Sequence, residues 1–144
     1  MAKPIPEIFK AHRETIEKHS TKQKFSAGSC IFREGETDGD KAYIIIEGEV
    51  SVVRQVRSKE KELAVTSTGD ILGEVALFSV GPRTATARAK TDVTALVLSR
   101  QDFQKLKEED IAVAYELVES ILSIVANRLR STLERLEVIY FWLT

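Results

Sequence analysis

Short apolar segments with glycines between them fill the middle of the chain, and this pattern constrains the fold more than any other feature of the sequence. Segments of this length at close intervals, with glycine at the turns, are typical of an antiparallel β-roll or barrel. We expect a jelly-roll-like β-roll over residues 22–99, with Glu47-Gly48-Glu49 as a tight hairpin turn between two strands. The apolar segments are Phe25, Cys30–Phe32, Ala42–Ile46, Val50–Val56, Leu63–Thr66, Thr84–Ala89 and Thr94–Leu98.

Helices are expected before and after this roll in the sequence, so the predicted fold class is α+β. Before the roll, apolar residues recur at spacings typical of one helix face, which predicts an amphipathic helix over residues 4–20. After the roll, Ser99 followed by Asp102 has the form of a helix N-cap and predicts a short helix that ends near Lys107. The apolar residues of the first helix are Ile5, Ile8, Phe9 and Ile16.

A long helix is expected to begin near Asp110 and to complete the C-terminal helical region, residues 100–143. Its residues at alternating spacings of four and three form the heptad pattern of a coiled-coil seam. A helix of about 30 residues extends about 45 Å, which is longer than a small roll can cover, so we expect a parallel homodimer through this helix. The heptad residues are Val118, Leu122, Val125, Leu129, Thr132, Leu136, Ile139 and Leu143, and Leu117, Ile121, Ile124 and Leu133 widen the apolar surface toward the roll.

The overall composition favours one cytoplasmic domain over residues 1–144. The 21 Lys and Arg residues balance 22 Asp and Glu residues, which argues against direct binding to nucleic acid. The N-terminus lacks the apolar core of a signal peptide, and Ile111–Ala126 is shorter than a membrane span, so no membrane contact is expected. The single cysteine, Cys30, can form no intramolecular disulfide and is expected to be a small strand residue.

Two opposite charges flank a glycine turn and a proline in the segment GDILGEVALFSVGPRTATARA, residues 69–89. Isolated buried charges cost several kcal/mol unless something pairs them, so a ligand between Glu74 and Arg83 would explain both. Backbone N–H groups after Gly73 could bind an anion, and the forked guanidinium of Arg83 suits a phosphate. Glu74 would repel a phosphate but could accept a hydrogen bond from a ribose hydroxyl. A surface ion pair without a ligand, or a degenerate site, is the alternative.

Three motifs lie in a spacing that resembles a known family. They are Phe25-x-x-Gly28-x-x-Ile31-Phe32-x-x-Gly35-Glu36, Asp40-x-x-Tyr43-Ile44-Ile45-x-x-Gly48-x-Val50, and Gly69-Asp70-x-x-Gly73-Glu74-x-Ala76-Leu77 with Pro82-Arg83-Thr84-Ala85-Thr86. The chain resembles the cyclic nucleotide-binding domains of catabolite activator proteins, protein kinase regulatory subunits and cyclic nucleotide-gated channels. Residues 69–89 then correspond to the phosphate-binding cassette of that family.

The resemblance implies a role for each matching residue. Glu74 would accept the ribose 2′-hydroxyl, Arg83 would pair with the cyclic phosphate, and Leu77 would couple the cassette to the helices that follow. Thr132 resembles a threonine that contacts the amine of adenine, although it could equally be a polar register marker in a coiled coil. Thr84 matches a position that reaches the phosphate or, in guanine-preferring members, the purine. The complete expected ligand site is Gly73, Glu74, Val75, Ala76, Arg83, Thr84, Ala85 and Thr132.

Two departures from the family pattern stand out. The turn Glu36–Gly39 is one residue longer than usual, which we expect to alter a loop but not the cassette. No helix-turn-helix, kinase or channel segment follows the long helix, and the apolar residues 140–143 predict either packing against another surface or a chain that has been cut.

The leading hypothesis is a cytoplasmic sensor that binds cAMP, or less readily cGMP, and signals to an effector protein by repositioning its C-terminal helices. The alternative is the sensor half of a catabolite-activator-type transcription regulator that lacks its DNA-binding domain. An enzyme is the third hypothesis, because small cupin-type β-barrels host metal sites. Such barrels take histidine ligands from their strands, whereas His12 and His19 precede the first expected strand, so we expect no catalysis, no metal and no cofactor beyond the nucleotide ligand.

Overall fold

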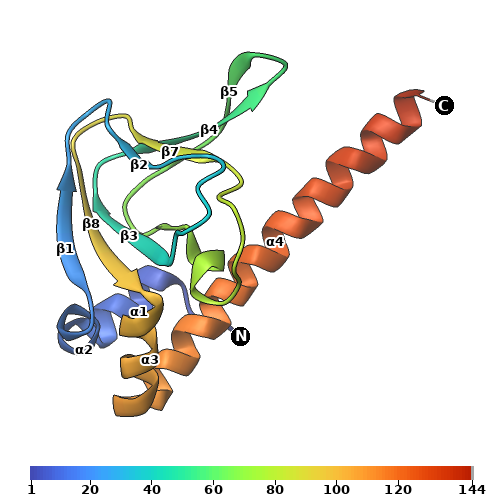
Figure 1. Ribbon diagram of the computed structural model, residues 1–144. Coiled ribbons are helices and arrows are strands. Elements are labelled where there is room, and N and C mark those ends of the chain that lie inside the picture. The colour runs from blue at the N-terminus through green and yellow to red at the C-terminus, as the bar shows by residue number, and fades with distance from the viewer. Residues whose placement is uncertain (144) are drawn as a thin grey trace.

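The computed structural model describes the backbone of residues 1–143 and the side chains of residues 1–136. Its elements are α1 (Ile5–Ala11), α2 (Arg13–Lys18), β1 (Thr21–Phe25), β2 (Cys30–Phe32), β3 (Lys41–Glu47), β4 (Val50–Val56), β5 (Lys59–Thr66), β6 (Ile71–Leu72), the 3₁₀ helix η1 (Glu74–Leu77), β7 (Thr86–Ala89), β8 (Val93–Ser99), α3 (Arg100–Glu109) and α4 (Ile111–Leu143). The strands form two antiparallel four-stranded sheets, in the orders β1-β8-β3-β6 and β2-β7-β4-β5 (Figure 1). The expected α+β class with an antiparallel roll is confirmed.

The sheet that contains β3 and β8 is buried on both faces, because apolar residues occupy both sides of the pleat. Along β3, Ala42 and Ile44 belong to the cluster shared with the helices, whereas Tyr43 and Ile45 belong to the cluster shared with the other sheet. Successive strand residues point to opposite faces, so an unbroken apolar strand requires cover on each side. This sheet therefore forms the wall between the interior of the roll and the helices.

Helices α1 to α3 and the first half of α4 gather against the outer face of this wall, as Figure 1 shows. Ile8, Ile16 and Leu106 are almost completely buried there, together with Val113 and Leu117 of α4. The predicted cap of α3 is confirmed, since the Asp102 N–H donates to Ser99 Oγ at 3.0 Å and the Ser99 N–H donates to Asp102 Oδ2 at 2.9 Å. The cap fixes where the chain turns from β8 into the helical layer.

Two local predictions are wrong. The single helix over residues 4–20 is two helices, because the backbone leaves helical geometry at His12, with φ −127° and ψ 31°. Glu47-Gly48-Glu49 is not a hairpin turn, because β3 pairs with β8 and β6 and so has no free edge for β4. The turn instead carries the chain into the second sheet, where β4 pairs with β5 across a turn at Arg57 and Ser58.

The predicted long C-terminal helix is confirmed. Helix α4 is 33 residues long, and its C-terminal part extends beyond the roll (Figure 1). Leu117 and Ile121 are buried, whereas the heptad residues Leu122 and Leu129 are 65% and 58% exposed. The two sets are not fully separated, because the heptad residue Val125 packs against the core and Leu133 is 56% exposed. The prediction that residues 140–143 pack against another surface concerns residues outside the described side chains. The same is true of the heptad residues Ile139 and Leu143. No helix within residues 1–143 combines the length and the apolar composition needed to cross a bilayer.

Candidate functional site

The glycine turn of the cassette joins β6 to η1 at the edge of the buried sheet. Gly73 has φ 70°, in the left-handed region that favours glycine, and a Cβ added there would lie 2.5 Å from Arg83 Nη1. The turn therefore depends on glycine for its backbone conformation and for room beside the arginine. It places Glu74 and Ala76 of η1 at buried positions and leaves Val75 exposed.

The carboxylate of Glu74 is 2% exposed and pairs with a cation from α4. Arg128 donates from Nη1 to Glu74 Oε1, and its Nη2 donates to the Ile71 carbonyl at 3.4 Å. A buried carboxylate needs such a partner because burial alone disfavours the charged form. Arg128 was not among the predicted site residues, because the only feature of the sequence that indicates it is its position one turn before Thr132 on the same helix.

The guanidinium of Arg83 is 9% exposed and is held by backbone carbonyls. Its Nη2 donates to the Lys41 carbonyl at 2.9 Å, its Nη1 donates to the Gly73 carbonyl at 3.3 Å, and its Cζ lies 4.3 Å from the centre of the Phe32 ring. Within residues 1–136, the Nε atom is buried without a hydrogen-bond partner, and no ion pair includes Arg83. A guanidinium has five N–H donors, so these two hydrogen bonds leave three of them for another partner.

Glu74 and Arg83 therefore do not pair with each other, and the surface ion pair considered as an alternative is wrong. Both side chains are buried and they have different partners: Arg128 pairs with Glu74, whereas backbone carbonyls accept from Arg83. The arrangement offers a carboxylate that can accept hydrogen bonds and a cation with spare donors. A ligand that carries both hydroxyl groups and an anion matches this pair of groups.

The longer turn after Gly35 contacts the cassette at Arg83. The Arg83 N–H donates to the Glu36 carbonyl at 2.8 Å, and the backbone of Gly39 lies directly against the Arg83 guanidinium. A cavity of about 180 Å³ beside Arg83 is lined by residues of this turn, including the acidic residues Glu36, Asp38 and Asp40. The turn is therefore part of the surroundings of the expected phosphate ligand.

The hydroxyl group of Tyr43 belongs to the same neighbourhood. Burial raises the pKa of Tyr43, and the negative charges of Glu36 and Asp40 act in the same direction, whereas Arg83 lowers it. The phenol is therefore neutral across the physiological range and can donate or accept a hydrogen bond at the cavity wall.

The remaining predicted residues are less tightly gathered. The Ala76 N–H donates to the Gly73 carbonyl at 3.2 Å, Thr84 is exposed and Ala85 is partly buried. Thr132 is exposed on α4, and its hydroxyl donates to the Arg128 carbonyl at 2.9 Å. The structure thus brings Gly73, Glu74, Ala76 and Arg83 together and connects Thr132 to them through Arg128.

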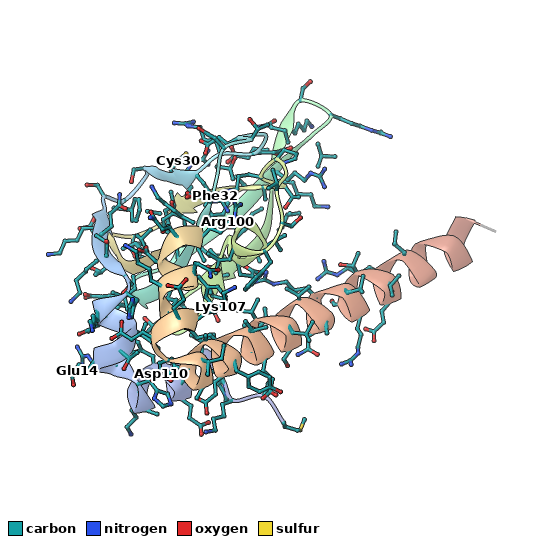
Figure 2. All side chains as sticks on the ribbon, turned by 60° about the horizontal axis from the view of Figure 1, so that its bottom comes forward. Glu14, Cys30, Phe32, Arg100, Lys107 and Asp110 are labelled. Atoms are coloured by element: carbon teal, nitrogen blue, oxygen red, sulfur yellow. The ribbon has the colours of Figure 1, made fainter. Side chains whose placement is uncertain are left out.

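The cassette also contacts the start of α3. Arg100 donates to the Ala76 carbonyl from Nε at 3.2 Å and from Nη2 at 2.7 Å, and the rings of Phe78 and Phe103 meet edge to face at 5.3 Å. Figure 2 shows Arg100 at one end of α3, with Lys107 toward the other. These contacts join η1 to the helical layer alongside the buried Leu77, which was the coupling residue that the resemblance implied.

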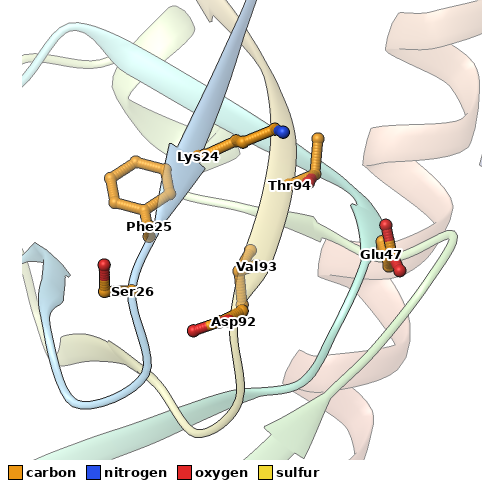
Figure 3. Close-up of a pocket in the computed structure, with 7 residues that line it drawn as sticks. All are labelled: Lys24, Phe25, Ser26, Glu47, Asp92, Val93 and Thr94. Atoms are coloured by element: carbon orange, nitrogen blue, oxygen red, sulfur yellow. The ribbon is translucent and has the colours of Figure 1, made fainter.

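A larger cavity of about 330 Å³ lies elsewhere, at the ends of β1 and β8 (Figure 3). It is lined by Lys24, Glu47, Asp92 and four neighbouring residues, and it contains none of the predicted ligand residues. Cavity size and buried charge therefore favour different places, and the predicted site is the one with the buried charges.

Known proteins share this architecture. The sequence is 36% identical over 118 residues to a CRP-like cAMP-activated global transcriptional regulator of Mycobacterium tuberculosis, covering 81% of this chain and 50% of the relative. The catabolite activator protein of Thermus thermophilus superposes with a TM-score of 0.77 at 28% identity, covering 94% of this chain and 60% of that protein. The N-terminal domain of a Streptomyces coelicolor transcriptional regulator gives 0.70 at 32% identity, with coverages of 88% and 85%.

These matches agree on the family, although the chain spans about half the length of the first curated relative. The family model described as the cyclic nucleotide-binding domain matches residues 22–110, which run from β1 through the cassette to the end of α3. The chain therefore belongs to the family of cyclic nucleotide-binding domains.

Proposed function

We propose that the chain is a cyclic nucleotide sensor that binds cAMP in preference to cGMP and signals through its C-terminal helices. The observation that carries the proposal is the pair of buried, oppositely charged side chains, Glu74 and Arg83, which both adjoin Gly73 and have different partners. This assigns the chain a regulatory role rather than a catalytic one.

In this proposal the ligand spans the two charges. The cyclic phosphate accepts hydrogen bonds from the free donors of Arg83, and the ribose 2′-hydroxyl donates to Glu74. Gly73, Val75, Ala76 and Ala85 supply backbone contacts, and the Thr84 hydroxyl donates to a phosphate oxygen. Hydrogen bonds to charged groups contribute about 1.5–3 kcal/mol each, so Arg83 and Glu74 dominate the affinity.

The preference for adenine is supported by the orientation of Thr132. Its hydroxyl has one hydrogen, which it donates to the Arg128 carbonyl. The oxygen then presents only lone pairs, which can accept from the amine of adenine but cannot donate to the carbonyl oxygen of guanine. Thr84 favours guanine by the family pattern, so the two positions compete in setting the preference.

The signal would pass through groups that touch both the cassette and the helices. Arg128 links α4 to Glu74, and Arg100 links α3 to the Ala76 carbonyl. A ligand that competes with Arg128 for Glu74, or that moves η1, binds one helix arrangement better than another. Such differential binding is what shifts a conformational equilibrium.

The exposed heptad stripe of α4 supports a parallel homodimer as the signalling unit. Leu122 and Leu129 face away from the roll, where a second copy of the chain would bury them in a coiled-coil seam. Two targets of the helices are proposed: an effector protein in trans, or a DNA-binding domain. The similarity to a transcriptional regulator over half of its length favours the sensor half of such a regulator.

Titration calorimetry with cAMP and cGMP tests the proposal. Wild-type protein should bind cAMP more tightly than cGMP, and Arg83→Ala should lose at least about tenfold in affinity, the value of one charged hydrogen bond. Arg54→Ala is the matched control, because Arg54 is a largely exposed arginine of β4. Equal binding by wild type and Arg83→Ala would contradict the site.

A further inference from the structure

The turn after Gly35 makes a contact that only glycine allows. A Cβ added to Gly39 would lie 2.6 Å from Nε of Arg83 and 2.9 Å from both Cζ and Nη2. Contacts this short between a Cβ and other heavy atoms do not occur, so any side chain at position 39 forces a shift. The φ angle of Gly39 lies outside the left-handed region, so room beside Arg83 is the only demand for glycine here.

The Phe32 ring provides a second contact for the same guanidinium. Its centre lies 4.3 Å from Arg83 Cζ, and the negative face of an aromatic ring attracts a cation at that distance. The ring itself is fixed by Tyr43, whose ring centre lies 5.9 Å away. Phe32 therefore stabilises the charged guanidinium without using any of its N–H donors.

We propose that Gly39 and Phe32 are positioning residues that hold the Arg83 guanidinium in place for the phosphate of a cyclic nucleotide. This inference rests on the proposed function. The two residues act with the carbonyls of Lys41 and Gly73, which fix the plane of the guanidinium by accepting from Nη2 and Nη1. A group fixed before binding loses little conformational freedom when the ligand arrives, which increases the affinity.

The acidic wall of the neighbouring cavity explains why the position of Arg83 matters. Glu36, Asp38 and Asp40 line this cavity together with Arg83 and Gly39. A larger residue at position 39 pushes the guanidinium off the Lys41 carbonyl, and a displaced cation next to three carboxylates pairs with one of them. An arginine neutralised in this way is lost to the phosphate.

A double-mutant cycle in cyclic nucleotide affinity tests the role of Gly39. Gly39→Ala should weaken cAMP binding by at least about tenfold in the wild-type background and by less than about twofold in the Arg83→Ala background. Thr37→Ala is the matched control, because Thr37 belongs to the same turn as Gly39, is exposed and does not line the cavity beside Arg83. An equal loss in both backgrounds, or no loss in either, would overturn the inference.

Thermal unfolding of the same proteins without ligand separates this inference from the proposed function. Gly39→Ala should lower Tm in the wild-type background and much less after Arg83→Ala has removed the side chain that it strikes. An equal fall in Tm in both backgrounds would overturn the contact itself. Wild-type protein that binds neither cAMP nor cGMP would contradict the proposed function, whereas normal binding by Gly39→Ala would contradict only the inference.

Phe32 is tested by a conservative pair of variants. Phe32→Tyr keeps the aromatic face and should retain affinity within about twofold, whereas Phe32→Leu removes it and should weaken binding several-fold, by about threefold or more. In the Arg83→Ala background the guanidinium is absent, so Phe32→Tyr and Phe32→Leu should bind cAMP with equal affinity. A difference between the two variants in that background would indicate a structural role of Phe32 that does not act through Arg83. Equal affinity of the Leu and Tyr variants in the wild-type background would remove Phe32 from the inference.

Discussion

Arg128 of α4 donates a hydrogen bond to Glu74 of the cassette, and this pair joins two residues that lie 54 positions apart in the sequence. The Glu74 side chain is 2% exposed, whereas that of Arg128 is 51% exposed. The pair thus consists of a half-exposed cation on α4 and a buried carboxylate in the candidate site. It is the direct connection between the residue expected to bind the sugar and the helix expected to transmit the signal.

Arg128→Ala should destabilise the protein by about 1–3 kcal/mol in urea unfolding, because it leaves a buried carboxylate without its partner. The half-exposed position of Arg128 keeps the cost at the lower end for buried pairs. Glu74→Gln is the matched second change, since it removes the charge and keeps the shape. If the double variant is no more stable than Arg128→Ala alone, the pair does not account for the burial of Glu74.

Thr132→Val should weaken cAMP binding by about 0.5–1.5 kcal/mol, the value of one neutral hydrogen bond, and leave cGMP binding nearly unchanged. Calorimetry with both nucleotides measures this difference. Thr84→Ala is the companion variant, because Thr84 is the position associated with guanine. Unchanged cAMP affinity in Thr132→Val, together with loss of cGMP binding in Thr84→Ala, would reverse the proposed preference.

The proposed homodimer depends on the exposed heptad residues of α4. Leu122→Glu combined with Leu129→Glu should convert the protein to a monomer in sedimentation velocity, because like charges would face each other across the seam. The fold of each chain should survive, since both leucines are exposed. Asn127→Glu is the control on another face of the same helix. A wild-type protein that sediments as a monomer would contradict the dimer.

Stability should fall in acid partly through Glu116. Hydrogen bonding to Lys3, with a smaller effect from His12, lowers the pKa of Glu116 below its ordinary value of 4.5. A carboxylate with a lowered pKa contributes stability above 4.5, and this contribution disappears as the pH falls through the lowered value. In urea unfolding at several pH values, Glu116→Gln should therefore be less stable at pH 7 and less sensitive to acid.

The same helix offers a matched control for that experiment. Glu119 lies on α4 but takes part in none of the ion pairs recorded among residues 1–136. Glu119→Gln should therefore follow the acid unfolding of the wild type. If Glu116→Gln follows it equally well, the contacts from Lys3 and His12 do not stabilise the fold.

Much of the fold was predictable, because apolar periodicity directly reports which faces are buried. The short apolar segments between glycines and the heptads of α4 are local patterns, and the structure confirms the strands and the long helix that they predict. The destination of the chain after Gly48 was not predictable, because a glycine turn looks the same whether the next strand pairs with the previous one or joins another sheet. That choice depends on β6 and β8, which occupy both edges of β3.

The candidate site, like the fold, could be predicted from the sequence only in part. Glu74 and Arg83 could be found from the sequence, because their charges are unusual in an otherwise apolar, glycine-rich segment. Arg128 and Gly39 could not, since one is an ordinary helix arginine and the other an ordinary loop glycine. Both acquire their importance from contacts with residues more than 40 positions away.

The length of α4 has a mechanical consequence for any signal that starts at the cassette. The helix is packed against the roll over its first turns and is joined to Glu74 through Arg128, and its side chains from Thr132 to Leu136 are exposed. Fifteen residues follow Arg128 up to the end of α4 at Leu143. At 1.5 Å per residue this arm is about 22 Å long, so a tilt of about 5° moves its tip by about 2 Å. Under the proposed function the helix would act as a lever, which enlarges a small adjustment at the sugar of the ligand into a displacement that a second protein surface can detect.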